Sequence, residues 1–201
     1  LERYLQLAAE GNIRIANTTT PAQYFHLLRR HARIATQRPL IIMTPKQLLR
    51  LPQAASALAD MAEGTRFHPV LAEPGVEDEN VTRLVLCTGK IYYDLIGHTD
   101  RASHVGLAVG RVELLYPFPE GQILELIGKY PNLKEIAWVQ EEPRNMGAWK
   151  VMSRRMPELL PEGVELTYIG RQGRASTGEG YSGAHMLEQE RIVLTALTPG
   201  T

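Results

Sequence analysis

Two segments of the chain carry residues that could do chemistry, and each of them follows an apolar run. CTGKIYYDL (87–95) contains Lys90, and WVQEEPRNMGAW (138–149) contains the adjacent carboxylates Glu141 and Glu142. In an open parallel α/β sheet, ligands and partner chains are met at the carboxyl ends of the strands. An amine at such an edge could hold an anion, and paired carboxylates could exchange protons. Both possibilities have a plainer structural alternative.

The Gly89-Lys90 step is compatible with a phosphate held at a helix N-terminus. A full phosphate loop has two glycines and a Lys-Ser/Thr pair, and this sequence lacks it. A tight turn from a strand into a helix is therefore the favoured interpretation, with Lys90 directed toward a neighbouring domain.

Glu141 and Glu142 are neighbours in sequence, whereas a general acid–base pair needs two carboxylates that converge on one point. Successive residues of an extended chain point to opposite sides, and Pro143 favours an extended backbone just before it. We therefore favour hydrogen bonds to the backbone or to a partner chain over a catalytic role for these two glutamates.

The histidines are too dispersed to suggest a metal site. A metal-binding pair on a helix needs a spacing of three or four residues. His26 and His31 are five apart, and they diverge by about 140° around a helix. The basic cluster has two interpretations: a solvated helix face, or an anion site, because arginine binds phosphate through two hydrogen bonds. Its members are Arg29, Arg30, Arg33 and Arg38.

The bulk composition excludes several classes of protein. The chain has 201 residues, of which 44% are hydrophobic, and this is enough for one domain or one and a half. Its 22 basic and 22 acidic residues cancel, which argues against general nucleic-acid binding. Cys87 is the only cysteine, so no internal disulfide can form and a reducing compartment is indicated. No apolar run approaches the ~18 residues of a membrane span, and no signal peptide opens the chain. We expect a cytoplasmic protein, or a mitochondrial matrix protein if the source is eukaryotic, with no membrane or nucleic-acid partner.

The first third of the chain predicts short helices and strands. Apolar spacing predicts an amphipathic helix over residues 1–10, and alternation predicts a strand at 13–15. Thr20 is an N-cap with Pro21 at the first position of a helix that runs to about His31. A buried strand at 38–44 and a polar helix over about 53–61 are expected to follow. Residues 72–80 lack apolar periodicity and hold Pro, Gly and four acidic residues, so we place a domain boundary there.

The remainder of the chain repeats a strand–helix pattern. Four strand–helix units in succession predict an α/β fold with a mainly parallel sheet and helices on both faces. The strands are expected at about 81–87, 105–115, 134–139 and 164–170, and the helices at about 89–96, 120–130, 149–156 and 184–196. The Gly- and Ser-rich stretch 171–183 is expected to be a long loop.

Long motifs of the chain, in order, resemble the C-terminal part of the thiamin-diphosphate-dependent 2-oxoglutarate dehydrogenase decarboxylating component. They are LERYLQLAAEGN, TTTPAQYFHLLRR, RPLIIMTPKQLLR, CTGKIYYDL, ELLYPFP and WVQEEPRNMGAW. The resemblance implies that residues 1–75 end a pyrimidine-binding, transketolase-like domain. It implies that residues 76–201 form a transketolase-C-terminal-like domain.

The resemblance also implies a function for a longer parent protein. That parent would decarboxylate 2-oxoglutarate and succinylate a lipoyl group in the tricarboxylic acid cycle, as a homodimer bound to the dihydrolipoyl succinyltransferase component. It would use thiamin diphosphate and Mg²⁺, but this chain lacks the Gly-Asp-Gly and distant Asn of the diphosphate site. The family's catalytic histidine would lie before Leu1. We therefore expect this chain alone to be inactive and to bind no cofactor, with no catalytic or metal-binding residue assigned. A 2-oxoadipate dehydrogenase of the same family, or a non-catalytic interaction module, is the alternative.

A few residues receive roles from the resemblance. The loop with Glu141 and Glu142 lies near the subunit contact in related thiamin enzymes, so these residues and Trp149 are predicted to lie at the dimer interface. Arg30 matches one ligand of an acetyl-CoA activator in actinobacterial relatives. The other ligands do not match: a glutamine is expected where Leu114 stands, and an arginine pair where the chain has Gly121 and Gln122. His185, in a shared AHMLEQE motif, is interpreted as a helix-start or interface residue rather than a base.

Overall fold

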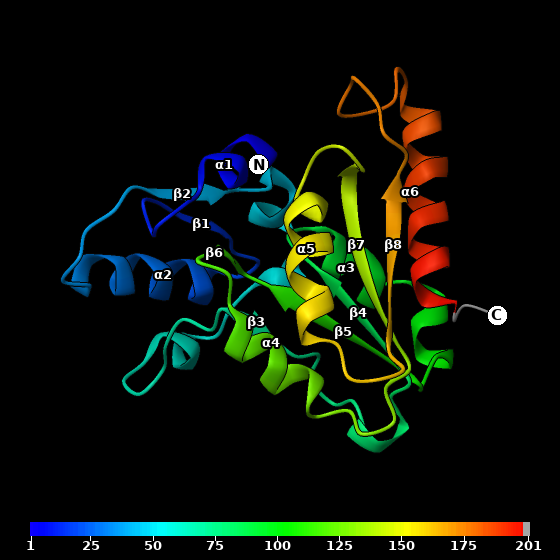
Figure 1. Ribbon diagram of the computed structural model, residues 1–201, viewed down its shortest axis with the longest axis horizontal. Coiled ribbons are helices and arrows are strands. Elements are labelled where there is room, and N and C mark those ends of the chain that lie inside the picture. Colours follow the sequence, from blue (N-terminus) through cyan, green and yellow to red (C-terminus); the bar gives the residue numbers. More distant parts are fainter. Residues whose placement is uncertain (199–201) are drawn as a thin grey trace.

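The computed structural model describes residues 1–198, which form two sheets with helices packed on them (Figure 1). The first sheet has three strands in the order β2-β1-β6, and the second has five in the order β3-β5-β4-β7-β8. None of the helices within these residues combines the length and apolar composition needed to cross a membrane.

The first sheet is built around one β-α-β unit. β1 (Arg14–Asn17) pairs in parallel with β2 (Leu40–Met43), and α2 (Pro21–Arg33) connects them. The Thr20 hydroxyl accepts a hydrogen bond from the Gln23 amide at 3.2 Å, which confirms the predicted cap. α1 (Glu2–Leu7) precedes the unit, and the late strand β6 (Leu114–Tyr116) completes the sheet in antiparallel orientation.

The predicted helix over residues 53–61 is wrong. The chain forms three separate 3₁₀ turns instead, at Lys46–Arg50, Pro52–Ala54 and Leu58–Met61. Among the residues of these turns only Ala54 is buried, so there is no apolar stripe to pack a continuous helix. The Asp60 carboxylate accepts from the Ala57 amide at 2.9 Å, and this local bond satisfies the start of the last turn.

The second sheet confirms the predicted strand–helix repeat. β4 is paired in parallel with β5 on one side and with β7 on the other, and β7 pairs in parallel with β8. The short β3 (Val70–Leu71) is an antiparallel edge. The strands are β4 (Arg83–Cys87), β5 (Leu107–Val112), β7 (Glu135–Pro143) and β8 (Glu165–Arg171). The helices are α3 (Ile91–Ile96), α4 (Glu120–Ile127), α5 (Trp149–Arg155) and α6 (Ser182–Leu197).

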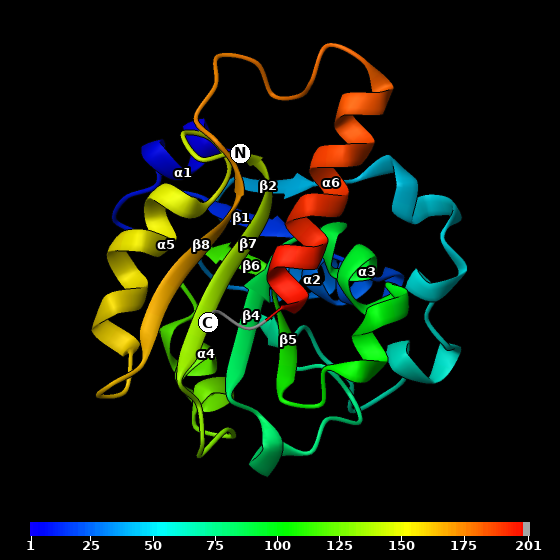
Figure 2. The ribbon, with the colours of Figure 1, turned by 90° about the vertical axis from the view of Figure 1, so that its right-hand side faces the viewer.

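The helices cover both faces of this sheet, as Figure 2 shows. Side chains of α3 and α6 pack with Val85 and Val139 on one face. Side chains of α4 and α5 pack with Leu84 and Trp138 on the other. Alternate residues of the strands therefore enter separate cores, as expected of a sheet covered on both faces.

The expected single strand over 105–115 is also wrong, because the chain leaves one sheet and enters the other at Glu113. β5 ends at Val112, and β6 then pairs with β1 of the first sheet. The Glu113 carboxylate is fully buried, and it accepts from the Thr19 amide at 2.9 Å and from the Thr19 hydroxyl. The polar residue thus joins the two sheets where the strand divides.

The two halves of the sequence exchange strands and share a core. β3 precedes residue 76 and lies in the second sheet, whereas β6 follows it and lies in the first. Leu5 and Ile15 belong to the same buried cluster as Leu84 and Leu86. The boundary at residues 72–80 stays a prediction.

Limited proteolysis checks this prediction. Residues 77–80 are exposed and include two glutamates, so a glutamate-specific protease is expected to cut first after Glu77 or Glu79. Because β3 and β6 each pair across the cut, we expect the two pieces to co-elute on gel filtration and to separate only in denaturant. Mass spectrometry of the first products identifies the bond. An earlier cut after Glu63, which is also exposed, would contradict the prediction.

Candidate functional site

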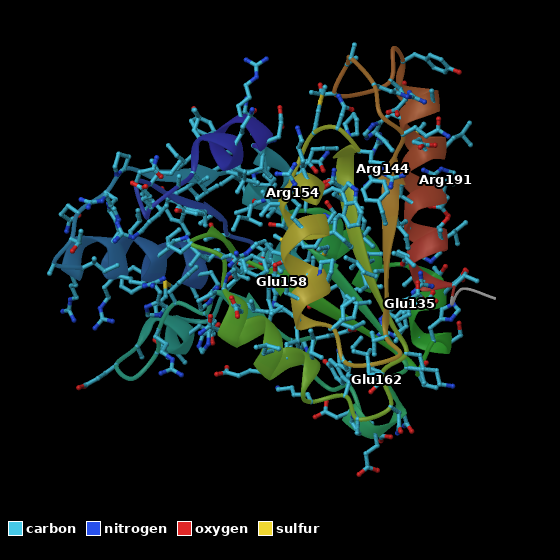
Figure 3. All side chains as sticks on the ribbon, viewed as in Figure 1. Glu135, Arg144, Arg154, Glu158, Glu162 and Arg191 are labelled. Carbon is cyan, nitrogen blue, oxygen red and sulfur yellow. The ribbon has the colours of Figure 1, made fainter. Side chains whose placement is uncertain are left out.

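The predicted segments meet at the carboxyl ends of β4, β7 and β8. β4 is connected to β5 on one side, whereas β7 is connected to β8 on the other, so the switch in strand order lies between β4 and β7. Ligands of open α/β sheets bind at such a point. Figure 3 shows Arg144 at this end of β7 and Glu135 near the other end. The last residues of β7 and the turn into α5, together called the 140–149 loop, therefore lie at the switch.

Gln140 organises this loop, although nothing in the sequence reasoning singled it out. Its side chain is 1% exposed. Its carbonyl oxygen accepts from the Trp138 indole at 3.0 Å, from the Trp149 amide at 2.9 Å and from the Ala148 amide at 3.2 Å. Its amino group donates to the carbonyls of Glu142, Pro143 and Met146 at 2.9 to 3.2 Å. One amide thereby satisfies both the turn and the start of α5.

Gly147 is required by the same arrangement. Its φ is +66°, and a Cβ there would lie 2.7 Å from the Gln140 amide nitrogen. Any other residue would be strained and would displace Gln140. The spacing of Gln140 and Gly147 within QEEPRNMG therefore reflects the packing of one turn.

Glu141 faces α3 and α6. Its carboxylate lies 3.1 Å from the Lys90 amine and accepts from Gln189 at 3.0 Å. The Lys90 amine also donates a hydrogen bond to the Asp94 carboxylate. Burial opposes the charge of Lys90, but Glu141 and Asp94 outweigh it and raise the lysine pKa. Lys90 is thus directed at two carboxylates of this chain, Glu141 and Asp94, and its charge is already paired.

Glu142 lies in a different environment. Burial raises its pKa, the neighbouring charge of Glu141 adds to this, and a hydrogen bond from its own backbone amide opposes it. Glu2 is near enough to act on the same carboxyl, and the Glu2 carboxylate accepts from the Gly147 amide at 3.2 Å. The two glutamates therefore have separate surroundings, as the extended backbone led us to expect.

Part of the Trp149 side chain is covered by other residues of this chain. Its ring lies 4.9 Å from that of Tyr168, and the Arg144 guanidinium lies 5.2 Å from the Tyr168 ring and 6.0 Å from the Trp149 ring. The indole is half-buried. Its predicted place at a dimer interface, with Glu141 and Glu142, stays a prediction.

Arg171 closes the site at the end of β8, and the sequence reasoning missed it. This arginine is 1% exposed. It donates to the Glu179 carboxylate at 2.9 Å, to the Glu141 carbonyl at 2.6 Å and to Gln189 at 3.2 Å. His185, at the start of α6, lies 3.3 Å from Glu179 and 3.2 Å from Arg171. These contacts attach the loop 172–181 to α6 and to the 140–149 loop.

Arg30 lies apart from this site, in an open cavity of about 560 Å³ between α2 and α4. Arg66, His68 and Lys129 also line the cavity, together with Glu125 and Gln122. Burial and the charge of Arg14 lower the Arg30 pKa, and its guanidinium lies 5.7 Å from the Phe67 ring. Glu120, at the start of α4, does not line the cavity and instead lies 3.6 Å from Arg155.

We predict that acetyl-CoA does not saturate this chain at micromolar concentrations. Leu114 is buried, Gly121 has no side chain and Gln122 is neutral, so the polar group and positive charges expected there by resemblance are missing. Glu125 adds a negative charge at the cavity. Calorimetric titration at moderate salt measures this, with Arg30→Ala as the control that should change nothing. Micromolar binding lost in Arg30→Ala would contradict the prediction.

Comparison with known proteins assigns the family. The sequence model of the family described as 2-oxoglutarate dehydrogenase C-terminal matches residues 55–197. The chain belongs to this family. The resemblance stated from the motifs is thereby confirmed.

Curated relatives agree with the family assignment. The 2-oxoglutarate dehydrogenase E1 component of Geobacillus kaustophilus is 51% identical over 204 residues, which cover 98% of this chain and 21% of that protein. Its counterpart in Bacillus subtilis is 50% identical over 205 residues, 98% of this chain and 22% of that protein. The Azotobacter vinelandii protein is 44% identical, with 98% and 21% covered. The chain thus spans about a fifth of the length of these relatives.

A solved structure supports the fold. A split-gene transketolase, described as an inactive beta4 tetramer, matches with a TM-score of 0.59 at 15% identity, covering 92% of this chain and 57% of that one. At this identity the match shows the fold alone. It confirms the expected transketolase-C-terminal-like α/β class, with helices on both faces of the sheet.

Proposed function

We propose that the chain is the C-terminal part of the decarboxylating component of a 2-oxoglutarate dehydrogenase. The parent would oxidatively decarboxylate 2-oxoglutarate with thiamin diphosphate and Mg²⁺ and transfer the succinyl group to a lipoyl group of the dihydrolipoyl succinyltransferase. The match to the C-terminal family over residues 55–197 carries this proposal. The bacterial relatives are named as E1 components, which supports a place in a multienzyme complex of the tricarboxylic acid cycle and in the cytoplasm.

The residues of this chain do not fit a thiamin diphosphate site of their own. The sequence has no Gly-Asp-Gly with a distant Asn. Within residues 1–198, no group of three His, Cys, Asp or Glu side chains could hold a metal ion. The charged groups at the switch in strand order form ion pairs with one another, Lys90 with Glu141 and Arg171 with Glu179. We therefore assign this part of the parent a structural role.

The test is an assay of the parent-length protein with thiamin diphosphate and Mg²⁺. Decarboxylation of 2-oxoglutarate is expected, with the 201-residue chain alone inactive and giving no calorimetric heat with the cofactor. A higher kcat/KM for 2-oxoadipate would assign the alternative dehydrogenase instead. Cofactor binding or activity of the isolated chain would contradict the structural role.

We further propose that the parent is a homodimer with the 140–149 loop near the contact, and Trp149→Glu tests this. Arg144, Trp149 and Tyr168 form a half-exposed aromatic surface with a charge beside it, which suits an interface. The substitution is expected to raise the dimer dissociation constant at least about tenfold, since a buried charge costs more than a lost contact. Sedimentation of the parent measures it.

A neighbouring residue provides the control. Lys150→Glu changes the charge at an exposed position next to Trp149 and should alter dissociation far less. Thermal unfolding of the 201-residue chain checks that Trp149→Glu still folds. A folded variant that stays fully dimeric would place the contact elsewhere.

A further inference from the structure

His185 was singled out by its motif, and the proposed function gives it no role. It lies in the first turn of α6, and its side chain is 53% exposed. Its Nδ1 atom lies 3.2 Å from the Nη2 atom of Arg171 and 3.3 Å from the Oε2 atom of Glu179. One ring nitrogen is therefore within hydrogen-bond distance of both a cation and a carboxylate.

These two contacts of His185 require opposite states of the same nitrogen. A guanidinium can only donate, so the bond from Arg171 needs an Nδ1 atom that carries no proton. An ionised carboxylate can only accept, so the bond to Glu179 needs an Nδ1 atom that carries one. A neutral ring with its proton on Nε2 therefore bonds Arg171, and a protonated ring bonds Glu179.

Arg171 and Glu179 keep their charges while a histidine titrates. Arginine is effectively always protonated in proteins, and the hydrogen bond from Arg171 lowers the pKa of Glu179. Histidine is the side chain whose charge ordinarily changes between about pH 5 and 8. The other nitrogens of Arg171 have acceptors of their own, since Nε donates to Glu179 at 2.9 Å and Nη1 to the Glu141 carbonyl at 2.6 Å. The state of the His185 ring thus decides which of the two partners it bonds.

The partner of His185 matters for the segment 172–181, which we call the strap. The strap connects β8 to α6 and projects beyond the carboxyl ends of the strands (Figures 1 and 2). Its first half is fixed to the 140–149 loop, because the Asn145 side chain donates to the Arg174 carbonyl and accepts from the Arg174 amide, both at 2.9 Å. Its second half is held through the Glu179 carboxylate, which contacts Arg171 of β8 and His185 of α6. Only the contact with His185 ties this carboxylate to α6.

We propose that His185 is a pH-dependent latch that ties the strap to α6 when its ring is protonated and releases the strap when its ring is neutral. At low pH a proton from solvent binds Nδ1, and Nδ1–H donates to Glu179. As the pH rises this proton returns to solvent, and Nδ1 accepts from Arg171 instead. The strap then keeps its bonds to β8 and to the 140–149 loop but loses its bond to α6. The half-exposed ring gives solvent protons access to the latch.

Other charged groups stand near the latch, and the tests separate them from His185. Beyond Arg171 and Glu179 they are Arg174 of the strap, Glu141 of the 140–149 loop, Glu188, Glu190 and Arg191 of α6, and Lys90, Asp94 and His98 across the groove between α3 and α6. His98 lies 3.2 Å from Glu190 of α6 and is the other histidine of this set. It therefore provides the matched control.

Nitrogen NMR of the histidine rings tests the exchange of partners without any substitution. The chemical shifts of the two ring nitrogens show which of them carries a proton. At about pH 8 the His185 ring is expected to be neutral with its proton on Nε2, and at about pH 5.5 both nitrogens are expected to be protonated. A neutral ring with its proton on Nδ1 would mean that Glu179 keeps its bond at every pH, and this result would overturn the proposal.

A spin label on the strap measures its release. Thr177→Cys places a thiol at an exposed position of the strap, whereas Cys87 is buried and burial raises its pKa, so Cys87 should not react. In the 201-residue chain the mobile component of the label spectrum is expected to be minor at about pH 5.5 and to become the major one at about pH 8.

Two substitutions assign this response to a residue. His185→Asn removes the titrating ring and should abolish the pH dependence of the label spectrum, whereas His98→Asn should leave that dependence unchanged. Equal mobility at both pH values without these substitutions would overturn the proposal, and so would a pH response that survives in His185→Asn. The latch exchanges one hydrogen bond for another, so its readouts are the ring's partner and the strap's mobility rather than the free energy of unfolding.

Discussion

Replacing Gln140 with leucine is expected to lower the free energy of unfolding by about 3 to 5 kcal/mol. The substitution keeps the volume but removes all six hydrogen bonds of the carboxamide. The Trp138 indole and the amides of Ala148 and Trp149 would lose their acceptor in a region without water access. A buried donor left without a partner costs about 1 to 3 kcal/mol. Urea denaturation of the chain, followed by fluorescence, measures the loss.

The control for this prediction is the same change at an exposed position. Gln122→Leu on α4 removes an amide that faces solvent and should stay within about 0.5 kcal/mol of the wild type. Gln140→Glu should lower the free energy of unfolding about as much as Gln140→Leu. The glutamate keeps the acceptor oxygen, but it places a negative charge where the amino group of Gln140 donates to three carbonyls. If Gln140→Leu unfolds at the same urea concentration as Gln122→Leu, the loop does not depend on this amide.

Arg171→Met is the second large change, with an expected loss of about 3 to 5 kcal/mol. The side chains of Arg171 and Glu179 are 2% and 6% exposed, so removing the arginine leaves a carboxylate in a nearly closed site. Glu179→Gln in the same chain should recover part of the loss, because it removes the uncompensated charge. Arg155→Met is the matched control, since the Arg155–Glu120 pair is about half exposed and such pairs contribute about 0 to 1 kcal/mol.

The effect of Arg171 should depend on pH in a defined direction. The hydrogen bond from Arg171 lowers the pKa of Glu179 below its ordinary value of 4.5. A lowered folded-state pKa gives stability that is complete above the unfolded value and is lost as the pH falls through the folded one. The difference between wild type and Arg171→Met is therefore expected to be constant near neutrality and to shrink below pH 4.5. A difference that grows on acidification would mean that another group pairs with Arg171.

Periodic apolar patterns predicted most of the fold, because strands and helices buried in one domain carry their signal locally. The strand–helix repeat after residue 80 and the parallel sheet were found in this way, and the Thr20 cap was found from the Thr-Pro pair at the start of α2. The 3₁₀ turns of 46–61 were not, because their residues bury no apolar stripe. The division of the strand at Glu113 was not either, since it depends on a partner distant in sequence. Alternation alone cannot show that Glu113 meets Thr19.

The candidate site was predicted in place but not in detail. The position of Lys90, Glu141 and Glu142 at strand ends followed from the rule for parallel sheets. The polar residues that hold the site together, Gln140, Arg171 and Gln189, were missed because a single buried polar side chain has no periodic signature. A glutamine at the end of the apolar run EIAWV was the one available signal.

The exchange of β3 and β6 between the sheets has a consequence for synthesis on the ribosome. β1 and β2 emerge long before β6, so the first sheet must wait for some seventy further residues before its last strand is available, as the gap between Met43 and Leu114 shows. During that interval the edge of β1 that later pairs with β6 is without its partner. Such unpaired edges are where nascent chains associate wrongly. Slow translation between β2 and β6 would prolong this exposure, and chaperone binding to the emerging chain should be strongest there.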